Sequence, residues 1–203
     1  MEQWGSNFLR YDFHNYNVES SVRANVRPIF YSYSKFTLIL QQQFNPSIVM
    51  LKIGDKAPDF TVLDQNGQSH SLSQYIGSKL VLYFYPKDNT PGCTAQACNL
   101  RDHYAILKQK GIVLLGLSTD TVSKHKKFET QYKLPFPLLA DTDKHIVNLY
   151  GVWAEKKFIG RTYMGILRWT FLINEEGVIV HIIDKVTTKD HTKQILDFWS
   201  DSI

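Results

Sequence analysis

The residues of this sequence best suited to covalent chemistry are its two cysteines, Cys93 and Cys98, both within residues 86–102. A cysteine reacts as its thiolate, and the start of a helix favours that form because its unpaired N–H groups and the helix dipole present positive charge. Cys93 is predicted to lie at such a start. We therefore expect Cys93 to be a nucleophile, and not the buried structural thiol that an isolated cysteine usually is.

A buried strand and a helix are expected to position these thiols. The apolar run Leu80–Tyr85 has no break and ends at Pro86, which is typical of a strand covered on both faces. Thr90 is a plausible N-cap, and one helix is predicted from there to Gly111. Its apolar face repeats at steps of three and four and consists of Ala97, Leu100, Tyr104 and Leu107.

The helix geometry sets a condition on any bond between the two thiols. On a regular helix their Cα atoms would lie about 8.6 Å apart, whereas a disulfide spans at most about 7 Å. If Cys93 and Cys98 pair, the first turns of the helix must unwind. This predicts a redox cycle that contains a conformational step.

The flanks of Cys93 resemble the active-site signature of the peroxiredoxins. The pattern is Pro86-x-x-x-Thr90-x-x-Cys93, and with Cys98 it is similar to the subfamily called bacterioferritin comigratory protein or peroxiredoxin Q. The resemblance runs from about residue 52 to residue 199. It includes the separated blocks GDKAPDF, STD, FPLLAD, YGVW and RWTFLI. It implies a thioredoxin-like α/β fold and a thiol-dependent peroxidase for hydrogen peroxide and organic hydroperoxides, without metal, haem or flavin.

The resemblance also implies how the first turn of the helix acts on peroxide. Cys93 would be the nucleophile and would become a sulfenic acid. The backbone N–H groups of Gly92 and Cys93 would face the developing charge, and glycine would let the substrate approach closely. Thr90 would turn its hydroxyl toward the sulfur and would also cap the helix. Pro86 would form one wall of the pocket.

Three more positions take their meaning from the resemblance. Arg168 matches the arginine that the family places before a late strand and would hold Cys93 as thiolate; spacing alone would favour an exposed salt bridge. Cys98 would resolve the sulfenic acid to an intramolecular disulfide, which thioredoxin or a similar dithiol protein would reduce. Gln96 stands where relatives often have glutamate, which leaves open whether this position handles protons. The bulky Trp169 after the arginine is interpreted as a local variation.

Two other function classes compete with a peroxidase. A non-catalytic redox sensor or binding protein would use the same oxidation of Cys93 to change a partner surface. A disulfide exchanger is disfavoured, because that class uses Cys-x-x-Cys, whereas four residues separate Cys93 from Cys98.

The composition limits which binding partners and which cellular compartment we expect. The 203 residues are 43 % hydrophobic and 21 % charged, as in an ordinary globular chain. The net charge is +4 and the basic residues are scattered, so we expect neither nucleic acid nor membrane as a partner. No apolar stretch approaches the roughly 18 residues of a membrane span. The few cysteines indicate a reducing compartment, and we expect a cytoplasmic monomer.

Histidines give no metal site in this interpretation. Cys93, Cys98 and His103 recur every five residues, which distributes them around a helix and prevents them from converging on one ion. The remaining candidates are scattered and are interpreted as surface or packing residues. They are His70, His125, His145, His181 and His191.

The chain is expected to consist of an N-terminal extension at residues 1–49 and a thioredoxin-like domain at residues 50–203. The extension is rich in aromatic residues and has no sustained period, so we expect it to be poorly ordered, with Met50 as the natural start. Organelle targeting by this segment is less favoured, because acidic residues interrupt it.

The domain is predicted as a central mixed sheet flanked by helices, preceded by a hairpin around Asn66-Gly67. Besides the strand before Cys93, strands are expected at residues 112–117, 138–140, 169–173 and 178–183. Helices are expected at residues 122–132, 144–150 and 188–199, and a loop at residues 151–165.

Overall fold

The computed structural model describes residues 50–200, apart from residue 159 and the side chain at 158. The predicted extension at residues 1–49 lies outside this part of the chain. Within residues 50–200, no helix combines the length and the apolar character that crossing a membrane requires.

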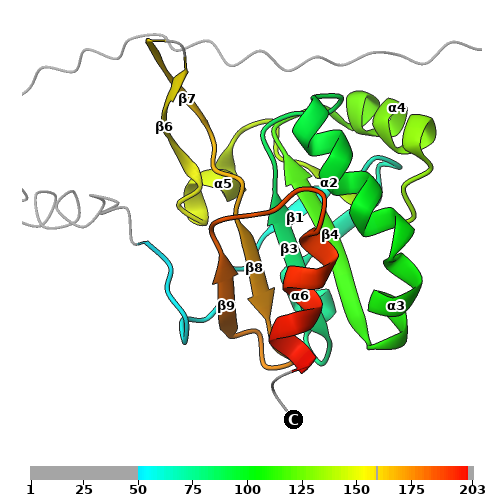
Figure 1. The fold of residues 1–203 in the computed structure, drawn as a ribbon. Helices are drawn as coiled ribbons and strands as arrows, with labels where there is room; N and C mark the ends of the chain where they lie inside the picture. The colour runs from blue at the N-terminus through cyan, green and yellow to red at the C-terminus, as the bar shows by residue number, and fades with distance from the viewer. Residues whose placement is uncertain (1–49, 159, 201–203) are drawn as a thin grey trace, which may run out of the picture. The chain divides into compact units, whose positions relative to one another are not determined.

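A five-stranded mixed sheet forms the centre of the described domain (Figure 1). In spatial order its strands are β5 (Leu138–Ala140), β4 (Ile112–Ser118), β3 (Lys79–Phe84), β8 (Thr170–Ile173) and β9 (Ile179–Ile183). Strands β3, β4 and β5 are parallel, while β8 is antiparallel to β3 and β9 is antiparallel to β8. The predicted α/β class with a mixed sheet is confirmed.

Strand β3 is buried on both faces because its alternate residues enter two different cores. Leu80, Leu82 and Phe84 pack with α5 (His145–Leu149), whereas Val81 and Tyr83 pack with the helices of the other face. Those helices are α2 (Pro91–Asp102), α3 (Tyr104–Gln109), α4 (Val122–Tyr132) and α6 (His191–Ser200). Figure 1 shows α2 and α6 lying side by side over the sheet. This arrangement holds the start of α2 at the end of β3.

The predicted hairpin around Asn66-Gly67 is present. Strand β1 (Thr61–Leu63) pairs antiparallel with β2 (Ser69–Ser71), and a short 3-10 helix, η1 (Leu72–Tyr75), follows. Gly67 has a φ of 74°, a backbone conformation that glycine adopts without steric cost. The turn chemistry read from the sequence therefore specified the connection correctly.

The helix predicted to continue to Gly111 is wrong at its middle, since it breaks at His103. Nδ1 of His103 lies 2.8 Å from the backbone oxygen of Asn99, the acceptor that an uninterrupted helix would offer to the His103 N–H. That N–H bonds the oxygen of Arg101 instead, so α2 ends at Asp102 and α3 begins at Tyr104. A side chain has thus competed with the backbone for a helical carbonyl.

The loop predicted at residues 151–165 is also wrong, because this segment forms a β-hairpin. Strand β6 (Trp153–Phe158) pairs antiparallel with β7 (Arg161–Ile166), and Gly160 at the turn has a φ of 71°. Figure 1 shows this ribbon extending away from the sheet. Most of β7 is exposed, so neither strand carries the apolar alternation by which half-buried strands are recognised.

Candidate active site

Cys93 occupies the first turn of α2 and is almost fully buried, with 2 % of its surface exposed. Thr90 is the residue before the helix and Pro91 is its first residue, so Gly92 and Cys93 supply the first backbone N–H groups. The initial N–H groups of a helix have no acceptor within it. These two amides and the sulfur therefore lie together at the positive end of the helix dipole.

Arg168 contacts the sulfur from the segment that leads into β8, the strand beside β3. Strand β8 pairs Thr170 with Tyr83 near the end of β3, and the Phe84 N–H bonds the oxygen of Trp169 at 2.8 Å. This pairing places residue 168 beside the start of α2. Its Nη2 donates to Sγ of Cys93 at 3.2 Å. A permanently charged donor at this distance favours the thiolate electrostatically.

Gly92 and Trp169 leave space beside Cys93 for the Arg168 guanidinium. A Cβ atom added to Gly92 would lie 3.3 Å from Nη2 of Arg168, so a larger residue would crowd the contact. The side chain of Trp169 packs with the core of the other sheet face, where its ring lies 6.4 Å from that of Phe171. The bulk of Trp169 is thus directed away from Cys93.

The prediction that the Thr90 side chain caps the helix is wrong. Its side chain makes no capping hydrogen bond, and its hydroxyl donates to the backbone oxygen of Lys87 at 3.1 Å. The hydroxyl proton is therefore engaged within the loop, while the oxygen keeps lone pairs that can accept. Pro86 lies half-buried at the end of β3, at the other side of the same loop.

Gln96 and Cys98 lie further along α2. Gln96 is fully buried, and its Oε1 accepts a hydrogen bond from Nη1 of Arg168. One guanidinium thus holds both the sulfur and this amide. Cys98 is half-buried, and both thiols are free. Because the two cysteines lie on one continuous helix, the expectation that α2 unwinds before they pair still applies.

A buried carboxylate that the sequence did not reveal anchors the loop before the helix. Asp88 accepts from the Tyr85 hydroxyl at 2.8 Å and lies 2.8 Å from Nδ1 of His125, while its own N–H donates to Asp120 at 2.8 Å. His125 also donates from Nε2 to the oxygen of Leu139 at 3.1 Å. The interpretation of His125 as a surface or packing residue missed this role, because lysines surround it in the sequence.

Replacing Asp88 by alanine is expected to lower the free energy of unfolding by about 2–4 kcal/mol, because two buried polar groups would lose this carboxylate and keep only a 3.3 Å contact with each other. Those groups are the Tyr85 hydroxyl and Nδ1 of His125. Asp88→Asn is the matched control, since its amide can still accept from one group and donate to the other, and should cost about 1 kcal/mol. Urea unfolding measures both values, and equal losses would contradict this account.

A second cation approaches the site from the β6–β7 hairpin. Nζ of Lys156 donates to the backbone oxygen of Ile166 at 3.1 Å, two residues before Arg168. Burial, together with the charge of Arg168, lowers the pKa of Lys156, while Cys93 acts in the opposite direction. Lys156 therefore belongs to the electrostatic surroundings of the thiol. Lys156 was not predicted to belong to the site, because it lies in a segment that was interpreted as a loop.

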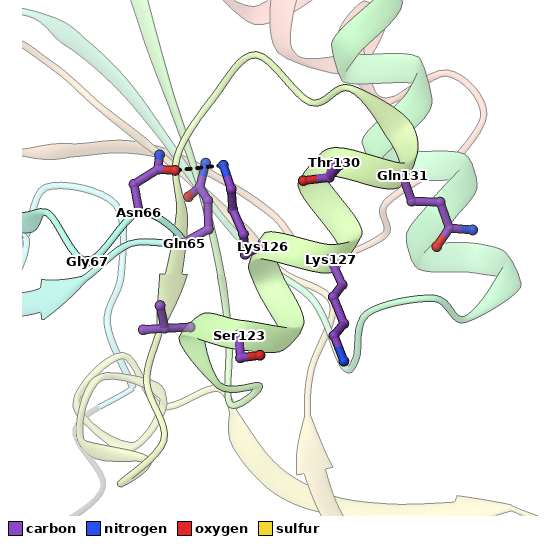
Figure 2. A pocket seen from close by; sticks show the side chains of 9 residues that line it. Gln65, Asn66, Gly67, Ser123, Lys126, Lys127, Thr130 and Gln131 are labelled. Atoms are coloured by element: carbon purple, nitrogen blue, oxygen red, sulfur yellow. Dashed lines mark hydrogen bonds between the residues drawn. The ribbon is translucent and has the colours of Figure 1, made fainter.

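A groove of about 990 Å³ lies elsewhere, between the β1–β2 turn and α4 (Figure 2). Figure 2 shows the Lys126 amine bonded to Asn66, whereas the Lys127 side chain extends away from that turn. The walls of this groove contain no cysteine, histidine or carboxylate. They are formed by Gln65, Asn66, Gly67, Val122, Ser123, Lys126, Lys127, Thr130 and Gln131. The groove thus contains neither thiol of the chain and is separate from the surroundings of Cys93.

A family model described as the AhpC/TSA family matches residues 53–182. The chain belongs to this family. A relative from Haemophilus influenzae, named putative peroxiredoxin bcp, is 49 % identical over 148 residues, which is 73 % of this chain and 96 % of the relative. Peroxiredoxin Bcp of Escherichia coli K12 is 45 % identical over 148 residues, 73 % of this chain and 95 % of that protein.

The fold agrees with that of solved peroxiredoxins. The crystal structure of a cysteine-to-serine mutant of PrxQ from Xylella fastidiosa superposes with a TM-score of 0.71 at 30 % identity, covering 75 % of this chain and 97 % of that one. The predicted thioredoxin-like fold and the bacterioferritin comigratory protein or peroxiredoxin Q subfamily are both confirmed. This peroxiredoxin is a thiol-dependent peroxidase.

Proposed function

We propose that Cys93 is the peroxidatic nucleophile, that Cys98 is the resolving residue, and that thioredoxin or a similar dithiol protein returns both to thiols. The observation that carries this proposal is the Arg168 guanidinium, 3.2 Å from a buried sulfur at the start of a helix. Two positive influences converge on one thiol, while a barely exposed sulfur limits contact with bulk water.

The chemistry follows from that environment. The Cys93 thiolate attacks one oxygen of the peroxide, the O–O bond breaks, and the second oxygen leaves with the electron pair and takes a proton. The products are a Cys93 sulfenic acid and water or an alcohol. The charge on the departing oxygen would be stabilised by Arg168 and by the N–H groups of Gly92 and Cys93. The Thr90 hydroxyl oxygen would accept a hydrogen bond from the peroxide O–H group and orient it, and Pro86 would form one wall of the pocket.

Resolution then uses the second thiol. Once the first turns of α2 have unwound, the Cys98 thiolate attacks the sulfenic sulfur, an S–S bond forms, and the hydroxyl group leaves and takes a proton to become water. A dithiol protein would reduce this disulfide by thiol exchange and become oxidised itself. We further propose that this cycle takes place in the cytoplasm, in a monomer, and that residues 50–203 form the thioredoxin-like peroxiredoxin domain.

The proposal is tested by peroxide-dependent NADPH consumption in the presence of thioredoxin and thioredoxin reductase. Wild-type protein should turn over with hydrogen peroxide and with an organic hydroperoxide. A non-catalytic sensor would consume one equivalent of peroxide and stop. Size-exclusion chromatography of the reduced protein tests the monomer.

Cys98→Ser is expected to separate oxidation from recycling. Cys93 should react once with peroxide at the wild-type rate, because Arg168 and the helix start are unchanged. Steady-state turnover should fall by at least about tenfold, because the intramolecular disulfide cannot form. Intact mass after one equivalent of peroxide should show an added oxygen in the variant and the loss of two hydrogens in wild type. An intermolecular disulfide in wild type would contradict the intramolecular resolution, because Cys93 would then be resolved by a cysteine of a second copy.

A further inference from the structure

A chain of buried polar groups connects the thiol to the C-terminal helix. Beyond Arg168, Nε2 of Gln96 lies 3.1 Å from Nδ1 of His191, whose Nε2 lies 3.0 Å from the hydroxyl of Thr170. The side chains of Gln96, His191 and Thr170 have essentially no exposed surface. The catalytic scheme above gives no task to His191, whose burial is compensated by these two specific hydrogen bonds.

The donors and acceptors of this chain are fixed by its first member. A guanidinium only donates, so the Gln96 oxygen must face Arg168 and its amide nitrogen must face His191. An amide nitrogen also only donates, so Nδ1 of His191 accepts. The imidazole proton then resides on Nε2 and is donated to Thr170. Burial, reinforced by the charge of Arg168, lowers the pKa of His191 to about 3, which agrees with a neutral ring.

The ring has little freedom to leave this orientation. Tyr83 packs edge-on against it, with ring centroids 6.1 Å apart and planes at 76°. His191 is the first residue of α6, and that helix is fixed in the core by Ile195 and Trp199. The acceptor offered to Gln96 is thus held rigidly by an element distant from the cysteines in sequence.

We propose that His191 is a positioning residue that holds Gln96, and through it Arg168, against Cys93, and that this contact latches α2 in its folded, peroxide-reactive form. The inference rests on the proposed function and deepens it. Gln96 lies between Cys93 and Cys98, within the segment that must unwind before they pair. Unwinding removes the Gln96 donor and leaves Nδ1 of His191 buried without a partner, which opposes the step.

The latch has two opposite consequences for the cycle. Weakening it lets Arg168 shift from the sulfur, which slows the oxidation of Cys93. It also lowers the cost of unwinding α2, which speeds disulfide formation after oxidation. A residue that only supports the fold would not require an acceptor at the Nδ1 position.

A matched pair of substitutions isolates that acceptor. In His191→Asn the Oδ1 atom stands near the place of Nδ1 and can accept from Gln96. In His191→Gln the amide reaches toward the place of Nε2 and keeps the Thr170 contact, while the Gln96 acceptor is lost. In rapid-quench experiments with hydrogen peroxide, His191→Gln should form sulfenic acid about tenfold more slowly and convert it to disulfide several-fold faster. His191→Asn should stay within about twofold of wild type in both steps.

Ile195→Val provides the stability control, because it lies fully buried on the same helix and makes no contact in the chain of polar groups. Its two rates should equal those of wild type. Equal rates for His191→Gln and wild type would overturn the proposal, as would the same pair of rate changes in Ile195→Val. Wild-type protein that fails to form any sulfenic acid would reject the peroxidase mechanism together with the latch, whereas a normal wild type with unaltered variants rejects the latch alone.

Discussion

Substitution of Cys93 by serine is expected to abolish peroxide-dependent turnover, with a loss of at least about 10⁴-fold. A serine hydroxyl cannot accept an oxygen atom from peroxide as a sulfur does, so no oxidised intermediate can form. The fold should survive, because serine is similar in size to the buried cysteine that it replaces. The measurement is NADPH consumption with the thioredoxin system, combined with the intact mass of the protein after peroxide treatment.

Cys98 provides the internal comparison for this experiment, since it remains in Cys93→Ser and is more accessible than Cys93. Cys98 interacts with Arg101 but lies beyond the first turn of α2, away from its unpaired N–H groups, so its reaction with peroxide should be slower than that of Cys93. Turnover that survives in Cys93→Ser would move the peroxidatic role to Cys98 or to another group. An unfolded variant would be recognised by its circular dichroism spectrum.

Replacing Arg168 by glutamine is expected to slow the oxidation of Cys93 by about 10²–10³-fold, the usual cost of removing one donor from a site of developing negative charge. The guanidinium acts on two states, because it favours the thiolate before the reaction and faces the departing oxygen during it. Glutamine preserves a polar side chain at this half-buried position but carries no charge. The measurement is the second-order rate constant for sulfenic acid formation at constant pH.

Arg168→Lys tests whether charge alone is sufficient. An ammonium retains the charge but lacks the planar fork that reaches Cys93 and Gln96 at the same time. We expect recovery to within about 10- to 30-fold of wild type. If lysine restored the full rate, geometry would be unimportant. If glutamine had no effect, the positive charge near the sulfur would have to come from the helix and Lys156.

The sequence by itself determined the elements whose signals are local. The apolar run before Cys93 predicted a buried strand, Asn66-Gly67 predicted the hairpin, and the helix at residues 122–132 was predicted with its observed bounds. Turn residues and apolar periodicity carry such information because both act over a few neighbouring positions. The family motifs added the chemical identity of Cys93, which no periodicity contains.

Local sequence signals did not predict the secondary structure correctly where a specific hydrogen bond determined it. The break at His103 depends on a side chain that takes a helical carbonyl, and the β6–β7 hairpin depends on its own ladder of hydrogen bonds. The roles of His125 and His191 could not be predicted from the sequence, because Asp88 and Gln96 lie 37 and 95 positions away from them. A pattern along the chain indicates which face of an element is buried, but it does not indicate which polar groups meet there.

The family resemblance named Arg168 as the cation beside Cys93, but only the tertiary structure decided the geometry with which the active site is assembled. Arg168 is 75 positions from Cys93 and reaches it because β8 returns antiparallel beside β3. His191 reaches Gln96 because α6 packs beside α2. The sequence thus supplied a reactive sulfur and a helix to carry it, while strand pairing and helix packing supplied the charge and the hydrogen bonds that hold it. The physical reason is that electrostatic and hydrogen-bond energies depend on distances in space, which only the folded chain fixes.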